Sequence, residues 1–131
     1  MIKAYIYARV SSKEQEREGF SIPAQLELLR EYAKKNDITV VKEFEDIETA
    51  KCSGRTYFNE MIKMLKNSKD INTILVEKTD RLYRNLTDYV LLDGMDVDLH
   101  FVKESVVLTK DSHSSEKFMH LILSLIHISQ G

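Results

Sequence analysis

The sequence predicts an α/β fold of three layers, in which a mostly parallel sheet of four to five strands carries helices on both faces. Segments with strand character alternate along the chain with segments whose apolar residues recur at helical spacing. The run Thr-Ile-Leu-Val at 73–76 carries no charge, as expected for a parallel strand that is buried on both sides. The chain has 131 residues, 43% of them hydrophobic, which is enough for one domain with its own core.

Residues 2–9 are the first expected strand, because both of its faces are apolar. A helix follows, since Ser21 is a suitable N-cap and Pro23 fits the first turn of a helix. Its apolar residues recur at helical spacing, at Ile22, Leu26, Leu29 and Ala33. A second strand is expected at 38–46. The helix after it has the apolar stripe Phe58, Met61, Ile62 and Leu65.

The second half of the chain continues the alternation, with a third strand at 72–78 and a third helix at about 82–92. That helix repeats apolar residues four apart, at Leu82, Leu86 and Val90. A fourth strand is expected at 99–104, and a last helix begins near Ser114.

Composition excludes several classes of protein. The single cysteine, Cys52, cannot form an internal disulfide, and the N-terminus lacks a signal-peptide pattern, so a cytoplasmic protein is expected. No apolar run is long enough to span a membrane. No phosphate-loop motif is present, and the four histidines lack metal-ligand spacing, so neither a metal nor another cofactor is expected. The net charge of −2 argues weakly against DNA binding by this piece alone, because non-specific affinity comes from many contacts of lysine and arginine to phosphates.

Polar and charged residues follow three of the expected strands. Ser11 follows the first strand, and Arg55 lies on the connection after the second. The third strand is followed by Asp80, Arg81 and Arg84. Because the carboxyl ends of parallel strands meet at one edge of a sheet, we expect these side chains to converge there. A hydroxyl nucleophile beside several guanidinium groups suits attack on a phosphodiester.

The serines also have a simpler interpretation. Ser11 and Ser12, taken alone, are typical turn or cap residues. Arg9 before them and Gln15 after them raise the odds of a functional site, although composition does not choose between the two serines.

The arginines after the third strand have two interpretations as well. Arg81 and Arg84 are three residues apart, so they are expected to share one face at the start of a helix. An isolated pair of this kind would be a solvated basic patch, but the helix dipole disfavours cations there, which suggests a bound anion. Asp80 would serve as the N-cap, as a partner that orients an arginine, or as a proton donor, and the N-cap role is favoured.

Two segments resemble the signature of the serine recombinases, the resolvase and invertase family: YARVSSKEQ at 7–15 and KTDRLYR at 78–84. The likeness is to the catalytic domain of that family. The family places its nucleophile directly after Arg-Val, which implies Ser11 rather than Ser12.

The resemblance also assigns supporting positions. Arg55 is similar to an arginine on the mobile loop of the family, although a surface arginine is nearly as good an interpretation. Gln15 and Gln25 match polar positions that support the family's site, whereas Gln25 alone would be read as an exposed helix residue. The segments GFSIPAQ at 19–25 and HSSEK at 113–117 look more like the large serine recombinases, a group with integrases and transposon excision enzymes.

The resemblance implies site-specific DNA recombination. Ser11 would attack a DNA phosphate, form a 5′-phosphoserine bond and release a 3′-hydroxyl. Four guanidinium groups would stabilise the charge on the phosphate oxygens, those of Arg9, Arg55, Arg81 and Arg84. A covalent intermediate retains the energy of the broken bond, so rejoining needs neither ATP nor a metal. The implied partners are double-stranded DNA and further copies of the chain, in a homodimer or tetramer of the complete protein.

The resemblance is expected to cover a catalytic domain at 1–122. Residues 123–129, LSLIHIS, back-translate readily to a transposon mosaic-end adapter used in sequencing libraries, so 123–131 are expected to be a non-native tail. The dimer helix and DNA-binding domains of the family would then be missing, and the fragment is expected to be inactive alone. The alternative is an apolar helix that ends a natural domain.

Two other classes of function remain open. One is a regulatory α/β domain that uses the arginines only to hold an anion. The other is a natural truncated module that binds or inhibits a complete recombinase.

Overall fold

The computed structural model describes residues 2–12, 21–51 and 55–109. Within these residues the strands are β1 (Ile2–Ser11), β2 (Ile38–Glu48), β3 (Thr73–Val76), β4 (Asp98–Phe101) and β5 (Val106–Leu108). The helices are α1 (Ile22–Lys35), α2 (Thr56–Asn67), α3 (Thr79–Leu82) and α4 (Leu86–Asp93), with a short 3-10 helix, η2 (Val102–Glu104). The sheet has the order β2-β1-β3-β4-β5, and every pairing is parallel except that of β4 with β5. The predicted α/β fold is confirmed.

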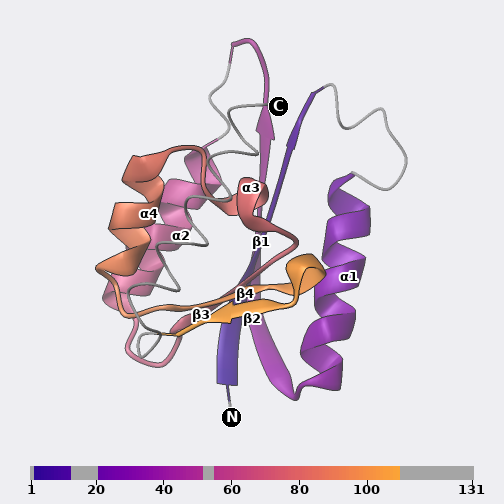
Figure 1. Ribbon diagram of the computed structural model, residues 1–131, viewed down its shortest axis with the longest axis vertical. Coiled ribbons are helices and arrows are strands. Elements are labelled where there is room, and N and C mark those ends of the chain that lie inside the picture. The colour runs from indigo at the N-terminus through magenta and orange to yellow at the C-terminus, as the bar shows by residue number, and fades with distance from the viewer. Residues whose placement is uncertain (1, 13–20, 52–54, 110–131) are drawn as a thin grey trace.

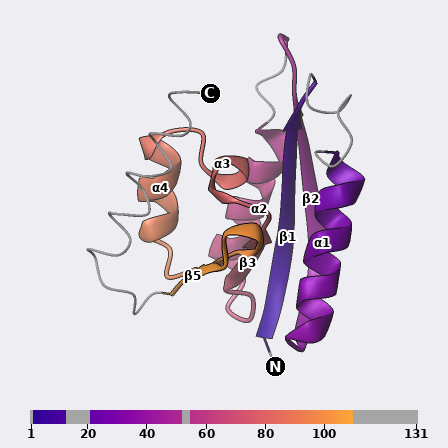
Figure 2. The same ribbon diagram turned by 45° about the vertical axis from the view of Figure 1, so that its right-hand side comes forward.

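Helices cover both faces of this sheet (Figure 1 and Figure 2). Helix α1 packs on one face, against a core that includes Ala4, Ile6, Ala8 and Val10 of β1. Helices α2 and α4 lie on the other face, where Tyr5 and Tyr7 of β1 pack with the buried stripe of α2. The alternation of side chains along β1 therefore divides its residues between two cores, as a central strand requires.

The predicted start of α1 is confirmed. Ser21 is the N-cap, and its Oγ accepts a hydrogen bond from the backbone N of Ala24 at 3.3 Å. The predicted stripe of α2 is confirmed as well, because all of its members are buried: Phe58, Met61, Ile62 and Leu65. No helix among the described residues is long and apolar enough to cross a membrane.

The predicted helix at about 82–92 is confirmed only from Leu86 onwards, because the segment is not one continuous helix. The chain forms the short helix α3, breaks, and starts again at α4, where Asn85 Oδ1 accepts a hydrogen bond from the backbone N of Asp88 at 3.1 Å. The break changes which side chains face the core. Leu82 is fully buried, but Leu86 is 53% exposed and Val90 is 61% exposed.

The predicted strand at 99–104 is also shorter than expected. β4 ends at Phe101, and η2 and Ser105, whose φ is 55°, turn the chain back into β5. Three predictions fall outside the described residues and stay predictions: the position of Gln15, the helix near Ser114 and the tail at 123–131.

A β-bulge in β2 determines which of its side chains lie on the face of the sheet that carries α2. The register with β1 runs from Ala4 opposite Val40 to Tyr5 opposite Lys42, so that Val41 is an extra residue. Before the bulge, Ile38 belongs to the core under α1; after it, the even-numbered Phe44 belongs to the core under α2. The bulge therefore turns the last even-numbered residues of β2 towards the face that carries α2, which is how bulges re-aim side chains near functional sites.

Candidate active site

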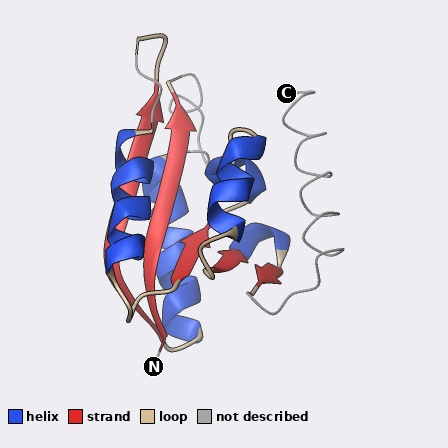
Figure 3. Ribbon diagram, turned by 90° about the vertical axis from the view of Figure 1, so that its left-hand side faces the viewer, coloured by secondary structure: helices blue, strands red, loops and turns tan. Residues whose placement is uncertain are grey.

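Ser11 is the last residue of β1, at the edge where the two longest strands end side by side (Figure 3). It is partly buried and lies opposite Glu48 in the register with β2. The neighbouring Ser12 is exposed, and its backbone N donates a hydrogen bond to the carbonyl of Glu48 at 2.9 Å. The predicted nucleophile thus lies on an ordered strand end that β2 holds in place.

Arg9 connects β1 to the segment after β3. Its Nε donates a hydrogen bond to the carbonyl of Arg81 at 3.2 Å, and its Nη2 donates to the carbonyl of Asp80. Its Nη1 lies 3.0 Å from Oε2 of Glu48 in an ion pair. Burial lowers the pKa of the Arg9 guanidinium, and the positive charges of Arg55 and Arg81 act in the same direction.

Gln25 of α1 fixes the backbone at Arg9. Its Oε1 accepts a hydrogen bond from the backbone N of Arg9 at 3.2 Å, and its Nε2 donates to the Arg9 carbonyl at 3.1 Å. β3 pairs with β1 only as far as Tyr7, so the side-chain amide takes the place of a missing strand. Gln25 is fully buried, which rules out the exposed helix position that the pattern alone indicates.

Arg55 is the N-cap residue of α2 and lies deep in the domain. Its Nη2 forms an ion pair with Oδ2 of Asp88 at 2.6 Å, and its guanidinium carbon lies 3.6 Å from the centre of the Phe58 ring. Its Nη1 donates a hydrogen bond to the carbonyl of Leu82 at 3.5 Å. Arg55 is therefore not the surface loop arginine of the simpler interpretation, because it joins α2 to both α3 and α4.

Asp46 is a site residue that sequence reasoning missed. Its Oδ2 accepts hydrogen bonds from the hydroxyl of Tyr7 at 2.7 Å and from the backbone N of Phe58 at 2.9 Å. Its Oδ1 accepts from the backbone N of Tyr57 at 3.0 Å. The carboxylate thus caps α2 from a neighbouring strand, since Arg55 makes no side-chain cap bond. Burial and the bond to Asp46 raise the pKa of the Tyr7 hydroxyl far above its usual value.

The two arginines after β3 do not share one helical face, which corrects the prediction. Arg81 lies in α3, where its Nε is 3.3 Å from Oε1 of Glu77 in a buried ion pair. Arg84 follows the end of that helix, and its Nη2 lies 3.5 Å from Oε1 of Glu48. The break before α4 separates the two side chains.

Asp80 is not the N-cap that was favoured. Lys78 takes that position, and Asp80 lies in the first turn of α3. The Asp80 carbonyl instead accepts a hydrogen bond from Arg9. Its Oδ1 is buried and has no hydrogen-bond partner within residues 2–12, 21–51 and 55–109. The remaining predicted roles are those of an orienting group and a proton donor.

One carboxylate joins the arginines that come from different segments. Oε2 of Glu48 binds Arg9 on β1, and Oε1 binds Arg84 after α3, while its backbone lies opposite Ser11. An anion with two oxygens can therefore contact both guanidinium groups directly beside the serine. This arrangement suits a phosphodiester as the ligand and serine as its attacking group.

A model of the family described as the resolvase N-terminal domain matches residues 4–129. The chain belongs to the resolvase family. A resolvase family site-specific recombinase from Streptococcus pneumoniae is similar to it, with 28% identity over 99% of this chain and 90% of that one, and a TM-score of 0.74. The N-terminal catalytic domain of TP901-1 integrase is similar at 27% identity, over 98% of this chain and 96% of that one, with a TM-score of 0.71.

A third similar structure is the C-terminal catalytic domain of ISC1926 TnpA, an IS607-like serine recombinase. It has 25% identity, a TM-score of 0.63, and coverage of 95% of this chain and 80% of that one. A comparison with curated protein sequences found no match. The predicted likeness to serine recombinase catalytic domains, large serine recombinases included, is confirmed.

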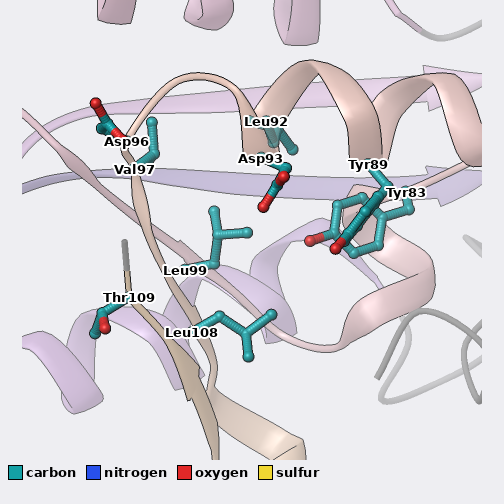
Figure 4. A pocket seen from close by; sticks show the side chains of 9 residues that line it. All are labelled: Tyr83, Tyr89, Leu92, Asp93, Asp96, Val97, Leu99, Leu108 and Thr109. Atoms are coloured by element: carbon teal, nitrogen blue, oxygen red, sulfur yellow. The ribbon is translucent and has the colours of Figure 1, made fainter. Parts of the chain in front are cut away.

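The described part of this resolvase domain shows no group of three or more histidine, cysteine, aspartate or glutamate side chains that could hold a metal ion. A separate, small pocket lies between α4 and the strands β4 and β5, and Figure 4 shows its lining. Tyr83 and Tyr89 lie at one end, and Leu99 and Leu108 lie on the strands. None of the predicted site residues lines it, so the pocket is no part of the arginine cluster.

Proposed function

We propose that this domain breaks and rejoins double-stranded DNA by site-specific recombination, with Ser11 as the nucleophile. The observation that carries the proposal is the bridge of one carboxylate, Glu48, between Arg9 and Arg84 beside Ser11. A site that holds a two-oxygen anion next to a hydroxyl can hold a phosphodiester in the same way. The family and the similar recombinases support this reading.

In the proposed reaction, the Ser11 Oγ forms a bond to phosphorus while the bond from phosphorus to the 3′ oxygen of DNA breaks. The products are a 5′-phosphoserine and a free 3′-hydroxyl, so the serine loses a proton and the leaving oxygen gains one. Arg9 and Arg84 stabilise the negative charge on the non-bridging oxygens. Rejoining is the same reaction in reverse, which needs no external source of energy.

Arg81 and Arg55 act on the site indirectly, by holding neighbouring residues in place. The carbonyl of Arg81 orients Arg9, and Arg55 fixes the start of α2 against Asp88. Asp80 is the proposed proton donor to the leaving 3′ oxygen, because its buried Oδ1 has no partner within the described ranges. Gln25 supports Arg9, and Gln15 is proposed to support Ser11.

The test uses the chain fused to a dimeric sequence-specific DNA-binding module. The module supplies DNA affinity, because a chain with a net charge of −2 is expected to bind DNA weakly by itself. The substrates are duplexes with random central sequence that carry sulfur in place of the bridging 3′ oxygen. Sulfur leaves without a proton, and the thiol rejoins poorly, so the covalent protein–DNA adduct accumulates. Mass spectrometry then locates the modified residue.

We expect an adduct at Ser11 in the wild type and in Ser12→Ala, and none in Ser11→Ala. On substrates with ordinary oxygen, Asp80→Asn should slow adduct formation about a hundredfold, and the sulfur substrate should restore it. Adducts at Ser12, or DNA bound without any adduct, would refute the proposal. The anion-holding regulatory domain would then be the better interpretation.

A further inference from the structure

We propose that Glu48 is a resident anion of the arginine cluster: its carboxylate occupies the position of the scissile phosphate, which has to displace it to bind. This inference rests on the proposed function. It assigns to Glu48 a positioning role, because the side chain holds Arg9 and Arg84 in place without touching the DNA.

The carboxylate of Glu48 is placed as the two non-bridging oxygens of a phosphodiester would be. Its two oxygens contact two different guanidinium groups, Oε2 with Arg9 at 3.0 Å and Oε1 with Arg84 at 3.5 Å. The two non-bridging oxygens of a phosphodiester would use the same donors. A carboxylate and a phosphate cannot both occupy the space between the two arginines, since two anions in contact repel each other.

The backbone beneath Glu48 stays in place while the side chain leaves. The residue lies opposite Ser11 in the register, and its carbonyl accepts the hydrogen bond from Ser12 at 2.9 Å. Displacement therefore needs only a change of side-chain rotamer, and it leaves the strand end that carries Ser11 unchanged.

Glu48 is also the most replaceable acidic partner of the four arginines. Its side chain is 34% exposed, against 5% for Glu77, the partner of Arg81, and 13% for Asp88, the partner of Arg55. A carboxylate in contact with water regains its hydration when it leaves, whereas a buried one would stay desolvated. The pairs of Glu77 and Asp88 therefore hold the fold, and the pair of Glu48 is the one that an incoming phosphate can exchange.

The experiment measures inorganic phosphate binding to the unfused chain, followed by the Nε–Hε NMR signals of its arginines. We expect Glu48→Gln to bind phosphate about tenfold tighter than the wild type, equivalent to roughly 1.4 kcal/mol. Glu48→Asp should lie between the two, because it keeps the charge but is too short to reach both arginines. The signals of Arg9 and Arg84 should move most in each titration.

Glu43→Gln is the matched control. Glu43 lies on the same strand and also pairs with one arginine, Arg30, at 2.6 Å, but on the face that carries α1. Its phosphate affinity should equal that of the wild type. Glu48→Ala is a second variant, and thermal melts of all variants report whether they fold.

Three results would overturn the inference. They are unchanged or weaker phosphate binding in both Glu48→Gln and Glu48→Ala, equal tightening in the Glu43 control, and failure of both Glu48 variants to fold, which would make the carboxylate a structural partner. An adduct at Ser11 in the trapping assay, together with any of these, would leave the proposed function standing. Tighter phosphate binding without any adduct would refute the function and keep Glu48 as a resident anion.

Discussion

The carboxylate of Asp46 holds the start of α2 against β1, and its removal tests how much this contact stabilises the chain. It is 3% exposed and accepts three hydrogen bonds: from the Tyr7 hydroxyl and from the backbone N atoms of Tyr57 and Phe58. In Asp46→Ala all three donors lose this acceptor, and those of Tyr7 and Phe58 are buried. Hydrogen bonds to a charged group contribute about 1.5–3 kcal/mol each, and neighbouring losses are not additive, so we expect the free energy of unfolding to fall by about 4 kcal/mol.

Urea unfolding of the chain measures this change directly. Asp46→Asn should lose about 2 kcal/mol, because the amide keeps one acceptor oxygen but turns donors towards the donors of α2. Tyr7→Phe removes one hydrogen bond and should cost about 1 kcal/mol. Glu45→Ala is the control, since Glu45 is the exposed neighbour on the same strand and should change stability by less than about 0.5 kcal/mol.

A loss below about 1 kcal/mol in Asp46→Ala would refute the reasoning, because it would mean that the start of α2 is held by other contacts. A loss in Asp46→Ala that Glu45→Ala matches would refute it as well, since the effect would then belong to the strand and not to the cap. The expected order, from least to most destabilised, is Glu45→Ala, Tyr7→Phe, Asp46→Asn and Asp46→Ala.

Three further results are expected. Gln25→Leu leaves the backbone of Arg9 without its amide partner and should cost about 2 kcal/mol in urea unfolding, whereas the exposed Glu27→Gln should cost almost nothing. Deletion of Val41 removes only the extra residue and keeps the pairs on either side of it, Ala4 with Val40 and Tyr5 with Lys42, so the chain should fold and still form the adduct at Ser11; a deletion that unfolds the chain would contradict the register. Burial lowers the pKa of His100 below its usual 6.5, so the unfolded chain takes up the proton first, and stability should fall as pH drops below about 6.5, less so in His100→Asn.

Much of the fold could be predicted because its signals are local. The uncharged run of β3, the cap of α1 at Ser21 and the stripe of α2 each follow from spacing and chemistry within a few residues. The break between α3 and α4 also had a local signal, the capping side chain of Asn85, but the spacing of Leu82, Leu86 and Val90 favoured one helix. In this case apolar periodicity was the weaker guide, because a four-residue helix and its neighbour imitate one longer helix.

The support of the site could not be predicted because it depends on long-range register. Asp46 and Glu48 reach the face of Arg9 only because Val41 is an extra residue in β2. A period-two pattern read from Ile38 places them on the opposite face, since one bulge inverts all that follows. The role of Gln25 also depends on residues far away in the sequence. Gln25 binds the backbone of Arg9 because β3 ends before β1 does, and no pattern within α1 reveals this difference in length.

The internal pairing of the arginines explains how a chain with a net charge of −2 keeps four of them in one cluster. Arg81 is matched by Glu77, Arg55 by Asp88, and Arg9 and Arg84 share Glu48. Mutual repulsion among the guanidinium groups is thereby offset before any DNA arrives, and the field that this edge projects into solution stays small. In the exchange proposed above, Glu48 leaves as the phosphate enters, so recognition would act at short range and owe little to long-range attraction. The same pairing would make the cluster selective among anions. An anion would displace Glu48 only if two of its oxygens reach the guanidinium groups of Arg9 and Arg84 as the carboxylate does.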